Sequence, residues 1–149
     1  MSQLSMHSPV GDLTVSEADG TIVSLDWGWG AEQTPTPLLT KAIAQLQSYF
    51  DGDQTGFALP LIPHGTPFQQ SVWSAMRAIP YGQTTSYGDI AHDIGSAARA
   101  IGRACGQNPL PILIPCHRVV GADGKLGGYS GNGGIETKTA LLRLEGALL

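Results

Sequence analysis

The sequence predicts an α/β protein in two parts: a small antiparallel sheet with one helix, and then a mainly helical domain that contains a helix-turn-helix. Short strand-like runs joined by turn residues fill the beginning of the chain, and capped segments with helical spacing fill most of the rest. Residues 60–65, between the two patterns, are rich in proline and glycine and form a candidate linker. We therefore expect an N-terminal supporting domain at residues 1–62 and a second domain at residues 63–149.

The composition indicates a folded protein of the cell interior. Of the 149 residues, 42% are hydrophobic and only 13% are charged, against roughly 25% charged residues in an average domain. No apolar run approaches the ~20 residues that span a bilayer, so we expect no membrane association, and the N-terminus lacks the pattern of a secretory signal. Two cysteines do not make a disulfide framework, so we expect a cytoplasmic, reducing environment in which a thiol stays free.

Charge is distributed unevenly along the chain, although the net charge is −4. Residues 1–63 contain one basic and seven acidic side chains, whereas residues 64–149 contain seven basic and five acidic ones. Such an asymmetry can mark the half that meets a polyanion such as DNA. It is equally compatible with chance in an acidic protein, and the charge pattern alone does not decide between the two.

Three strands are expected in the first domain, at residues 4–8, 12–17 and 21–27. The connections between them are short and have turn chemistry, which favours an antiparallel meander. A loop at residues 28–35 then leads to the helix.

Two helices are predicted to start alike, at Thr36-Pro37 and at Thr66-Pro67, with a capping hydroxyl followed by proline in the first turn. Gln69 adds the spacing of a capping box to the second start. Each helix has one apolar face. In the first helix this face consists of Leu39, Ala42, Ile43, Leu46, Tyr49 and Phe50, and in the second of Phe68, Val72, Ala75 and Met76.

A helix-turn-helix is expected in the middle of the second domain, with a short helix from Ser86, a turn at residues 95–96 and a second helix at residues 97–105. The second helix is rich in alanine, and Arg99 and Arg103 are four residues apart on one face. A narrow helix of this kind can approach a DNA duplex closely, and one arginine can enter the base stack. Tight packing between helices, with two solvated arginines, explains the same pattern.

The last third of the chain is predicted to contain a brief buried extended run at residues 112–114, a glycine-rich loop at 121–134 and a final helix at 137–145. The residues expected to face inward from the final helix are Ala140, Leu141 and Leu144.

Cys116 and His117 form the candidate reactive pair. A cysteine becomes a strong nucleophile as the thiolate, which needs a base or a positive field to form near neutral pH. Adjacent side chains on an extended backbone point to opposite faces, so we expect a water to carry the proton between them rather than direct contact. A buried, inert cysteine beside a histidine is an equally simple interpretation. Zinc-type ligand spacing is absent, so no metal site is predicted.

Several further motifs occur with this pair in one order, and together they closely resemble the O6-alkylguanine-DNA alkyltransferases. The resemblance is strong over residues 66–146 and covers residues 1–60 only in general layout. The matching segments are Phe68–Trp73, Ile79–Gly82, Ser86-Tyr87, Ala97–Gly102, Asn108-Pro109, Pro111–Val120, Tyr129–Gly131, Lys138 and Leu144–Gly146.

The resemblance implies DNA repair by irreversible, stoichiometric transfer of an alkyl group from O6-alkylguanine, or from O4-alkylthymine, to Cys116. It implies that His117 is the base, acting through a water, and that Glu145 orients and charges the imidazole. It also implies a ribonuclease-H-like N-terminal part, no cofactor, a monomer, and double-stranded DNA containing O6-alkylguanine as the partner.

The resemblance further implies binding roles for residues around this centre. Tyr87 would help to rotate the nucleotide out of the minor groove and donate to N3, and Asn108 would brace the turn before the active site. The base would contact Val119, Tyr129 and Ser130, and Arg99 would fill the gap in the duplex. The DNA-contacting residues would be Ser86, Ala98, Arg99 and Arg103.

Two departures from the family pattern and two rival functions remain. The turn at residues 94–97 is about two residues shorter than usual, and the segment at residues 129–141 is about two residues longer than in some relatives. A lesion-binding protein that accepts no alkyl group typically has another residue in place of Cys116. A cysteine hydrolase using Cys116, His117 and Glu145 would turn over repeatedly.

Overall fold

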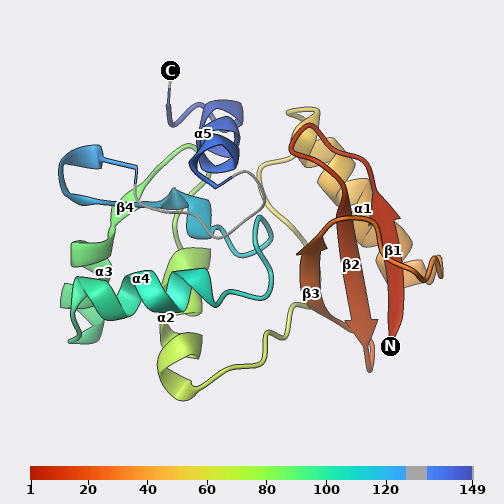
Figure 1. The fold of residues 1–149 in the computed structure, drawn as a ribbon, viewed down its shortest axis with the longest axis horizontal. Helices are drawn as coiled ribbons and strands as arrows, with labels where there is room; N and C mark the ends of the chain where they lie inside the picture. The colour runs from red at the N-terminus through yellow and green to blue at the C-terminus, as the bar shows by residue number, and fades with distance from the viewer. Residues whose placement is uncertain (127–133, 149) are drawn as a thin grey trace. The chain divides into compact units, whose positions relative to one another are not determined.

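The computed structural model describes residues 1–126 and 134–148, and the chain forms two compact units, Met1–His64 and Gly65–Leu149. The first unit contains an antiparallel sheet and one helix, and the second contains the other helices (Figure 1). The predicted α/β class, with a small sheet, one helix and a helical part containing a helix-turn-helix, is confirmed.

The sheet of the first unit has the strand order β1-β2-β3, and all neighbours are antiparallel. The strands are β1 (Ser2–Met6), β2 (Leu13–Ala18) and β3 (Thr21–Trp27). Strand β1 begins and ends two residues earlier than predicted. Ser8 closes a turn by accepting from the Gly11 amide at 3.1 Å, and Pro9 has no amide hydrogen with which to continue a ladder.

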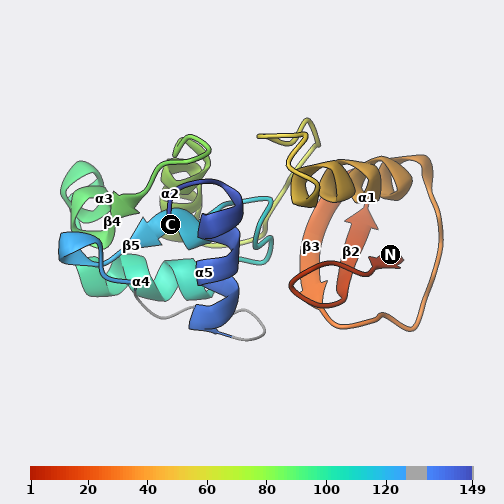
Figure 2. The same cartoon turned by 90° about the horizontal axis from the view of Figure 1, so that it is seen from above.

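Helix α1 (Pro37–Phe50) covers one face of this sheet (Figure 2). Thr36 caps it as predicted, because its hydroxyl accepts from the Leu39 amide at 3.1 Å. The core between helix and sheet consists of side chains that are fully buried, namely Leu13, Val15, Ile22, Leu39, Ala42, Leu46 and Tyr49.

The second unit is built from short elements. They are α2 (Pro67–Arg77), β4 (Thr85–Ser86), α3 (Tyr87–Ile94), α4 (Ala98–Gly106), the 3₁₀ turn η1 (Cys116–Arg118), β5 (Val119–Val120), the 3₁₀ turn η2 (Ala122–Gly124) and α5 (Ile135–Leu144). The capping box at Thr66 and Gln69 forms as predicted. Strands β4 and β5 pair in parallel, Thr85 with Val119 and Ser86 with Val120, which the sequence did not predict because each strand has only two residues.

Helices α3 and α4 form the helix-turn-helix and pack against each other and against α2. Gly95, between them, has φ of 81°, a left-handed conformation that suits glycine and ends α3 within one residue. Ser86 caps α3 by accepting from the Asp89 amide at 3.0 Å. The indole of Trp73 on α2 donates to the Ala104 carbonyl at 2.9 Å and fixes α4 to α2.

Three predictions about burial and conformation in this unit are wrong. Phe68 is 37% exposed, whereas Trp73, five residues further along α2, is buried. Residues 112–114 form a tight turn rather than an extended run, and Ile112 has φ of 73°. Ala140 is exposed, and on α5 the buried side chains are Thr137, Lys138, Leu141 and Leu142.

Candidate active site

Cys116, His117 and Arg118 occupy one buried 3₁₀ turn, η1, and not an extended segment. The Cys116 amide donates to the Ile114 carbonyl at 2.8 Å, and the Arg118 amide donates to the Pro115 carbonyl at 3.0 Å. The turn places three consecutive functional groups in the interior between α2 and α5. The predicted geometry of alternating faces is therefore wrong for these residues, since it assumed extended backbone.

Asn108 holds the segment that leads to η1. Its amide group donates to the Ile114 carbonyl at 2.9 Å, and its side-chain oxygen accepts from the Leu110 amide at 2.9 Å. These two hydrogen bonds span the strained turn that contains Ile112. Asn108 thus connects both ends of the segment that immediately precedes the Cys116 turn.

His117 and Glu145 are in direct contact, although 28 residues separate them in sequence. Nε2 of His117 lies 2.7 Å from Oε2 of Glu145, and both side chains are fully buried. A carboxylate can only accept, so the neutral imidazole donates from Nε2 and leaves Nδ1 as an unprotonated acceptor. Nδ1 is buried and has no hydrogen-bond partner among the described residues.

Arg118 binds the same carboxylate through two hydrogen bonds. Its Nε donates to Oε1 of Glu145 at 2.7 Å and its Nη2 to Oε2 at 3.0 Å, while its Nη1 donates to the Ile79 carbonyl at 2.8 Å. The guanidinium also lies 5.7 Å from the centre of the Tyr81 ring. This buried, bidentate pair fixes Glu145 and offsets its charge.

The pKa of His117 is lowered from its ordinary value. Burial is the main cause, and the hydrogen bond to Glu145 opposes it, while Arg118 and Lys138 lower the pKa further. His117 is therefore neutral at neutral pH, oriented by Glu145 and able to accept a proton at Nδ1.

Lys138 lies in the same interior, and the sequence motifs gave it no role. Its Nζ donates to the Val119 carbonyl at 2.7 Å and to the Tyr87 hydroxyl at 3.4 Å. Burial lowers the pKa of Lys138, and the nearby Cys116 and Cys105 oppose this. Burial also raises the pKa of Tyr87 to about 12, so this phenol keeps its proton. In the sequence, only the family motif includes Lys138, which is not among the side chains expected to face inward from the final helix.

The remaining residues with predicted roles divide into three groups. Ala98, Arg99 and Arg103 are exposed on α4, and Ser86 is half-buried as the cap of α3. Cys105, to which no motif gives a role, is buried and forms no disulfide with Cys116. Tyr129 and Ser130 lie outside the described residues.

Comparison with known proteins decides the family. Residues 67–147 match the model of the 6-O-methylguanine DNA methyltransferase DNA binding domain, and residues 3–63 match that of its ribonuclease-like domain. The chain belongs to the 6-O-methylguanine DNA methyltransferase family. The resemblance to alkyltransferases inferred from the sequence motifs is thereby confirmed.

Individual members of the family are similar to this chain over almost its whole length. A constitutive methylated-DNA–protein-cysteine methyltransferase of Bacillus subtilis is 45% identical over 93% of this chain and 92% of its own length. A methylated-DNA–protein-cysteine methyltransferase of Methanosarcina acetivorans is 40% identical over 95% of this chain and 96% of its own. The crystal structure of Mycobacterium tuberculosis OGT in complex with DNA matches with a TM-score of 0.88 at 46% identity, over 99% of this chain and 94% of that one.

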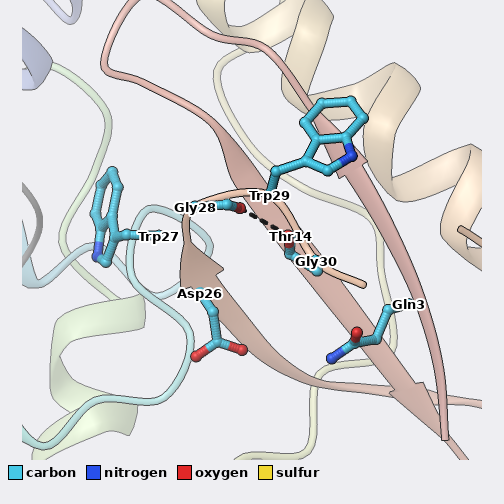
Figure 3. Close-up of a pocket in the computed structure, with 7 residues that line it drawn as sticks. All are labelled: Gln3, Thr14, Asp26, Trp27, Gly28, Trp29 and Gly30. Carbon is cyan, nitrogen blue, oxygen red and sulfur yellow. Dashed lines mark hydrogen bonds between the residues drawn. The ribbon is translucent and has the colours of Figure 1, made fainter. Parts of the chain in front are cut away.

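The ribonuclease-like domain contains a shallow hollow of about 130 Å³ beside the end of β3. Its lining residues are Gln3, Thr14, Asp26, Trp27, Gly28, Trp29 and Gly30, and none of them is a nucleophile paired with a base. Figure 3 shows the two indoles of Trp27 and Trp29 pointing in different directions, so they do not enclose a ligand between them. The candidate active site of this family member is therefore the Cys116 turn.

Two further findings concern the described residues. No group of three or more His, Cys, Asp or Glu side chains in this part of the chain is placed to hold a metal ion. Among the helices of the same residues, none combines the length and apolar character that a membrane crossing requires.

Proposed function

We propose that this protein repairs DNA by transferring an alkyl group from O6-alkylguanine to Cys116, once per molecule. The observation that supports this most directly is the buried Cys116 turn, whose His117 is oriented by Glu145 at 2.7 Å in a member of the methyltransferase family. O4-alkylthymine is a second candidate substrate of the same reaction type. We further propose that the protein acts in the cytoplasm as a monomer, without a cofactor.

The proton of Cys116 moves to His117 through a water in this mechanism. Nδ1 of His117 is buried and has no partner among residues 1–126 and 134–148, and a buried imidazole nitrogen of this kind needs a donor. A water between Nδ1 and the thiol satisfies that nitrogen and accepts the thiol proton as the imidazole takes one up. Glu145 then stabilises the imidazolium through Nε2.

Transfer is a substitution at the saturated alkyl carbon. The thiolate forms the S–C bond while the C–O6 bond breaks, and the electron pair of that bond leaves with guanine. Tyr87 donates a hydrogen bond to N3 of the departing base, because its high pKa keeps the hydroxyl protonated at neutral pH. The thiol proton taken up by His117 balances the negative charge that leaves with guanine. The product is a thioether, which water does not hydrolyse, so Cys116 is not regenerated.

Base and DNA contacts are assigned to residues around this centre. Asn108 braces the active-site turn, and the flipped base contacts Tyr87, Val119, Tyr129 and Ser130. Arg99 enters the duplex from the exposed face of α4 in place of the extruded nucleotide. The other DNA contacts are those of Ser86, Ala98 and Arg103. Residues 63–149 hold all these groups, and residues 1–62 form the supporting domain.

A label-transfer titration tests the proposal. Protein is mixed with an oligonucleotide carrying labelled O6-methylguanine under reducing conditions, and the label on protein is counted. We expect one label per molecule, located on Cys116 by mass spectrometry, with no transfer to a Cys116→Ser variant and full transfer to Cys105→Ser. Label that stays on DNA refutes the proposal.

The same titration separates the rival functions. A lesion binder leaves every label on DNA while binding it, and a hydrolase continues to release product after one equivalent. Single-turnover transfer excludes both.

A further inference from the structure

Glu145 lies at a helix end where a carboxylate is electrostatically unfavourable. It is the C-cap residue of α5, and its side chain is fully buried. The C-terminal end of a helix carries a partial negative charge, because its last carbonyl groups lack partners within the helix. Glu145 therefore keeps this position only if donors from other elements bind the carboxylate and the carbonyls around it.

Tyr81 supplies the donor for the last carbonyl of α5. The backbone amides that follow the helix donate to the carbonyls of residues 141–143, which are the three preceding ones. The carbonyl of Leu144 accepts from the Tyr81 hydroxyl at 3.3 Å, across 63 residues of sequence. Since this carbonyl belongs to the peptide bond before Glu145, the hydroxyl acts directly on the backbone that carries the carboxylate.

The ring of Tyr81 lies against the counterion of Glu145. Tyr81 belongs to the turn at residues 80–83, which a backbone hydrogen bond of 3.1 Å closes. The Arg118 guanidinium lies 5.7 Å from the centre of the Tyr81 ring. Its Nη1 donates to the carbonyl of Ile79, directly before the turn, at 2.8 Å. One short segment thus contacts both the guanidinium and the helix end that carries its carboxylate.

Gly82, the next residue of the turn, lies against the backbone of Glu145. Its φ of 82° is left-handed, a conformation that glycine adopts without strain. A side-chain carbon at this position would lie 3.3 Å from the Glu145 carbonyl oxygen, closer than an ordinary van der Waals contact. The turn therefore fits this helix end closely, and a change at Tyr81 or at Gly82 reaches Glu145.

We propose that Tyr81 is a positioning residue: by fixing the end of α5, it keeps Glu145 on Nε2 of His117. With Glu145 in place, the neutral imidazole has its proton on Nε2, and Nδ1 remains the acceptor for the thiol proton. The effect on His117 is independent of substrate, whereas its consequence for alkyl transfer rests on the proposed function. The charged groups that act on His117 are Glu145, Arg118 and Lys138.

Nitrogen NMR of the histidine rings tests this directly, because the ¹⁵N shifts of Nδ1 and Nε2 differ between the two neutral tautomers. The chain has four histidines, and His7, His64 and His92 are exposed. His117 is fully buried, and its signals are assigned by their absence from a His117→Gln variant. In the wild type near neutral pH, we expect a protonated Nε2 and an unprotonated Nδ1.

Two variants disturb the contact in independent ways, and each has a matched control in the first unit. Tyr81→Phe removes the hydroxyl and keeps the ring, while Tyr49→Phe removes a hydroxyl from a fully buried side chain on α1. Gly82→Ala places a methyl group against Glu145 and strains the backbone. Gly52→Ala causes the same strain, because Gly52 also has φ of 82°, but its methyl group would meet nothing within 4 Å among the described residues.

We expect the Nδ1 and Nε2 signals of His117 to move toward each other in Tyr81→Phe and in Gly82→Ala, since a displaced carboxylate lets both tautomers form. The two controls keep the wild-type signals, and circular dichroism and thermal melting verify that each protein is folded. Unchanged His117 signals in folded Tyr81→Phe overturn the proposal, and so does an equal change in Tyr49→Phe. Should Tyr81→Phe not fold, Gly82→Ala decides in the same way against Gly52→Ala.

Benzyl transfer from free O6-benzylguanine, measured against pH, tests the consequence for the reaction. We expect Tyr81→Phe to react roughly three- to tenfold more slowly than the wild type near neutral pH, a part of the ~100-fold or more that a general base contributes. The difference should shrink as pH rises, because hydroxide then removes the thiol proton without the help of His117. A merely structural loss lowers the rate by the same factor at every pH, and that result contradicts the positioning role in transfer.

The two measurements distinguish the role of Tyr81 from the proposed function. If the wild-type protein accepts no benzyl group but the His117 signals move in Tyr81→Phe, the proposed function fails and the effect of Tyr81 on Glu145 stands. If transfer proceeds and neither the signals nor the pH profile respond to Tyr81→Phe, the proposed function stands and the role of Tyr81 is refuted.

Discussion

Glu145 accepts hydrogen bonds from His117 and Arg118 at once, and the His117 contact is 2.7 Å long between two fully buried side chains. A carboxylate beside a histidine normally both orients the imidazole and raises its pKa, and here Arg118 opposes the second effect. Glu145 orients the imidazole, while Arg118 offsets the charge that would otherwise draw a proton to His117. The histidine thus stays neutral and ready to accept the thiol proton.

Replacing Glu145 with Gln should lower both stability and transfer. Arg118 would then remain buried without its anion, and breaking a buried pair costs about 3–5 kcal/mol. Urea unfolding measures this loss, and single-turnover transfer measures the rate.

The double variant Glu145→Gln with Arg118→Met is the matched control for this experiment. It removes both charges, so most of the stability should return, while transfer stays slow because His117 has lost its carboxylate. Recovery of transfer along with stability would contradict the orienting role of Glu145.

Arg99→Ala should slow repair of double-stranded DNA but leave transfer from free O6-benzylguanine nearly unchanged. Arg99 is exposed on α4 and touches no part of the Cys116 turn through any described hydrogen bond or ion pair. The loss should therefore appear only where a nucleotide must leave a base stack. Equal losses with both substrates would place Arg99 in the chemistry instead of the duplex.

Arg103→Ala should weaken binding to damaged and undamaged duplexes alike. A phosphate contact has no sequence or lesion preference, and its removal reduces the salt slope of log K by about one. Fluorescence anisotropy at several salt concentrations gives this slope. An unchanged slope means that Arg103 does not bind a phosphate.

Asn108→Ala should destabilise the protein by ~1–3 kcal/mol, because two half-buried hydrogen bonds to backbone groups are lost. Asn108→Asp retains the acceptor for Leu110 but places a carboxylate oxygen against the Ile114 carbonyl, so its effect combines the loss of the second bond with repulsion between the two oxygens. Urea unfolding of both variants measures these losses. Transfer should fall with stability if Asn108 braces the Cys116 turn.

Capping residues and apolar periodicity predicted most of the helices and the sheet, since these signals are local. Thr36 and Thr66 start helices where expected, and β3 has the predicted bounds. Residues 112–114 and η1 escaped prediction, because their conformation depends on Asn108 and on packing from α2 and α5. A short apolar run such as residues 112–114 has no periodicity that distinguishes an extended strand from a tight turn.

The candidate site was predictable only in part, and mostly through the family motifs. Cys116 and His117 are adjacent in sequence, but the contact of His117 with Glu145 is long-range and follows from no local pattern. The burial of Lys138 and the double use of Glu145 by Arg118 depend on tertiary packing. Neither can be read from spacing along a helix.

Cys105 should make the fold sensitive to alkali. Burial raises the pKa of Cys105 to about 12, and the neighbouring Cys116 adds to this, against an ordinary value of 9.0. Below the ordinary pKa, the thiol is protonated in both the folded and the unfolded protein, and the contribution of Cys105 to stability is fully present. Above it the unfolded chain releases the proton while the folded chain holds it, so stability falls as pH rises toward the folded pKa.

The expected loss from this one group is at most ~1.4 kcal/mol per pH unit. Cys105→Ala removes the slope, although it also removes a packed side chain at neutral pH. The free energy of unfolding in urea, measured for both proteins from about pH 8 to about pH 10, should therefore converge as pH rises. Tyr87 and Lys138 are present in both proteins, so most of their own pH dependence cancels in the difference between the two curves. Cys105 raises the pKa of both groups, so the difference includes that coupling. Parallel curves would show that Cys105 ionises as readily in the folded protein as in the unfolded chain.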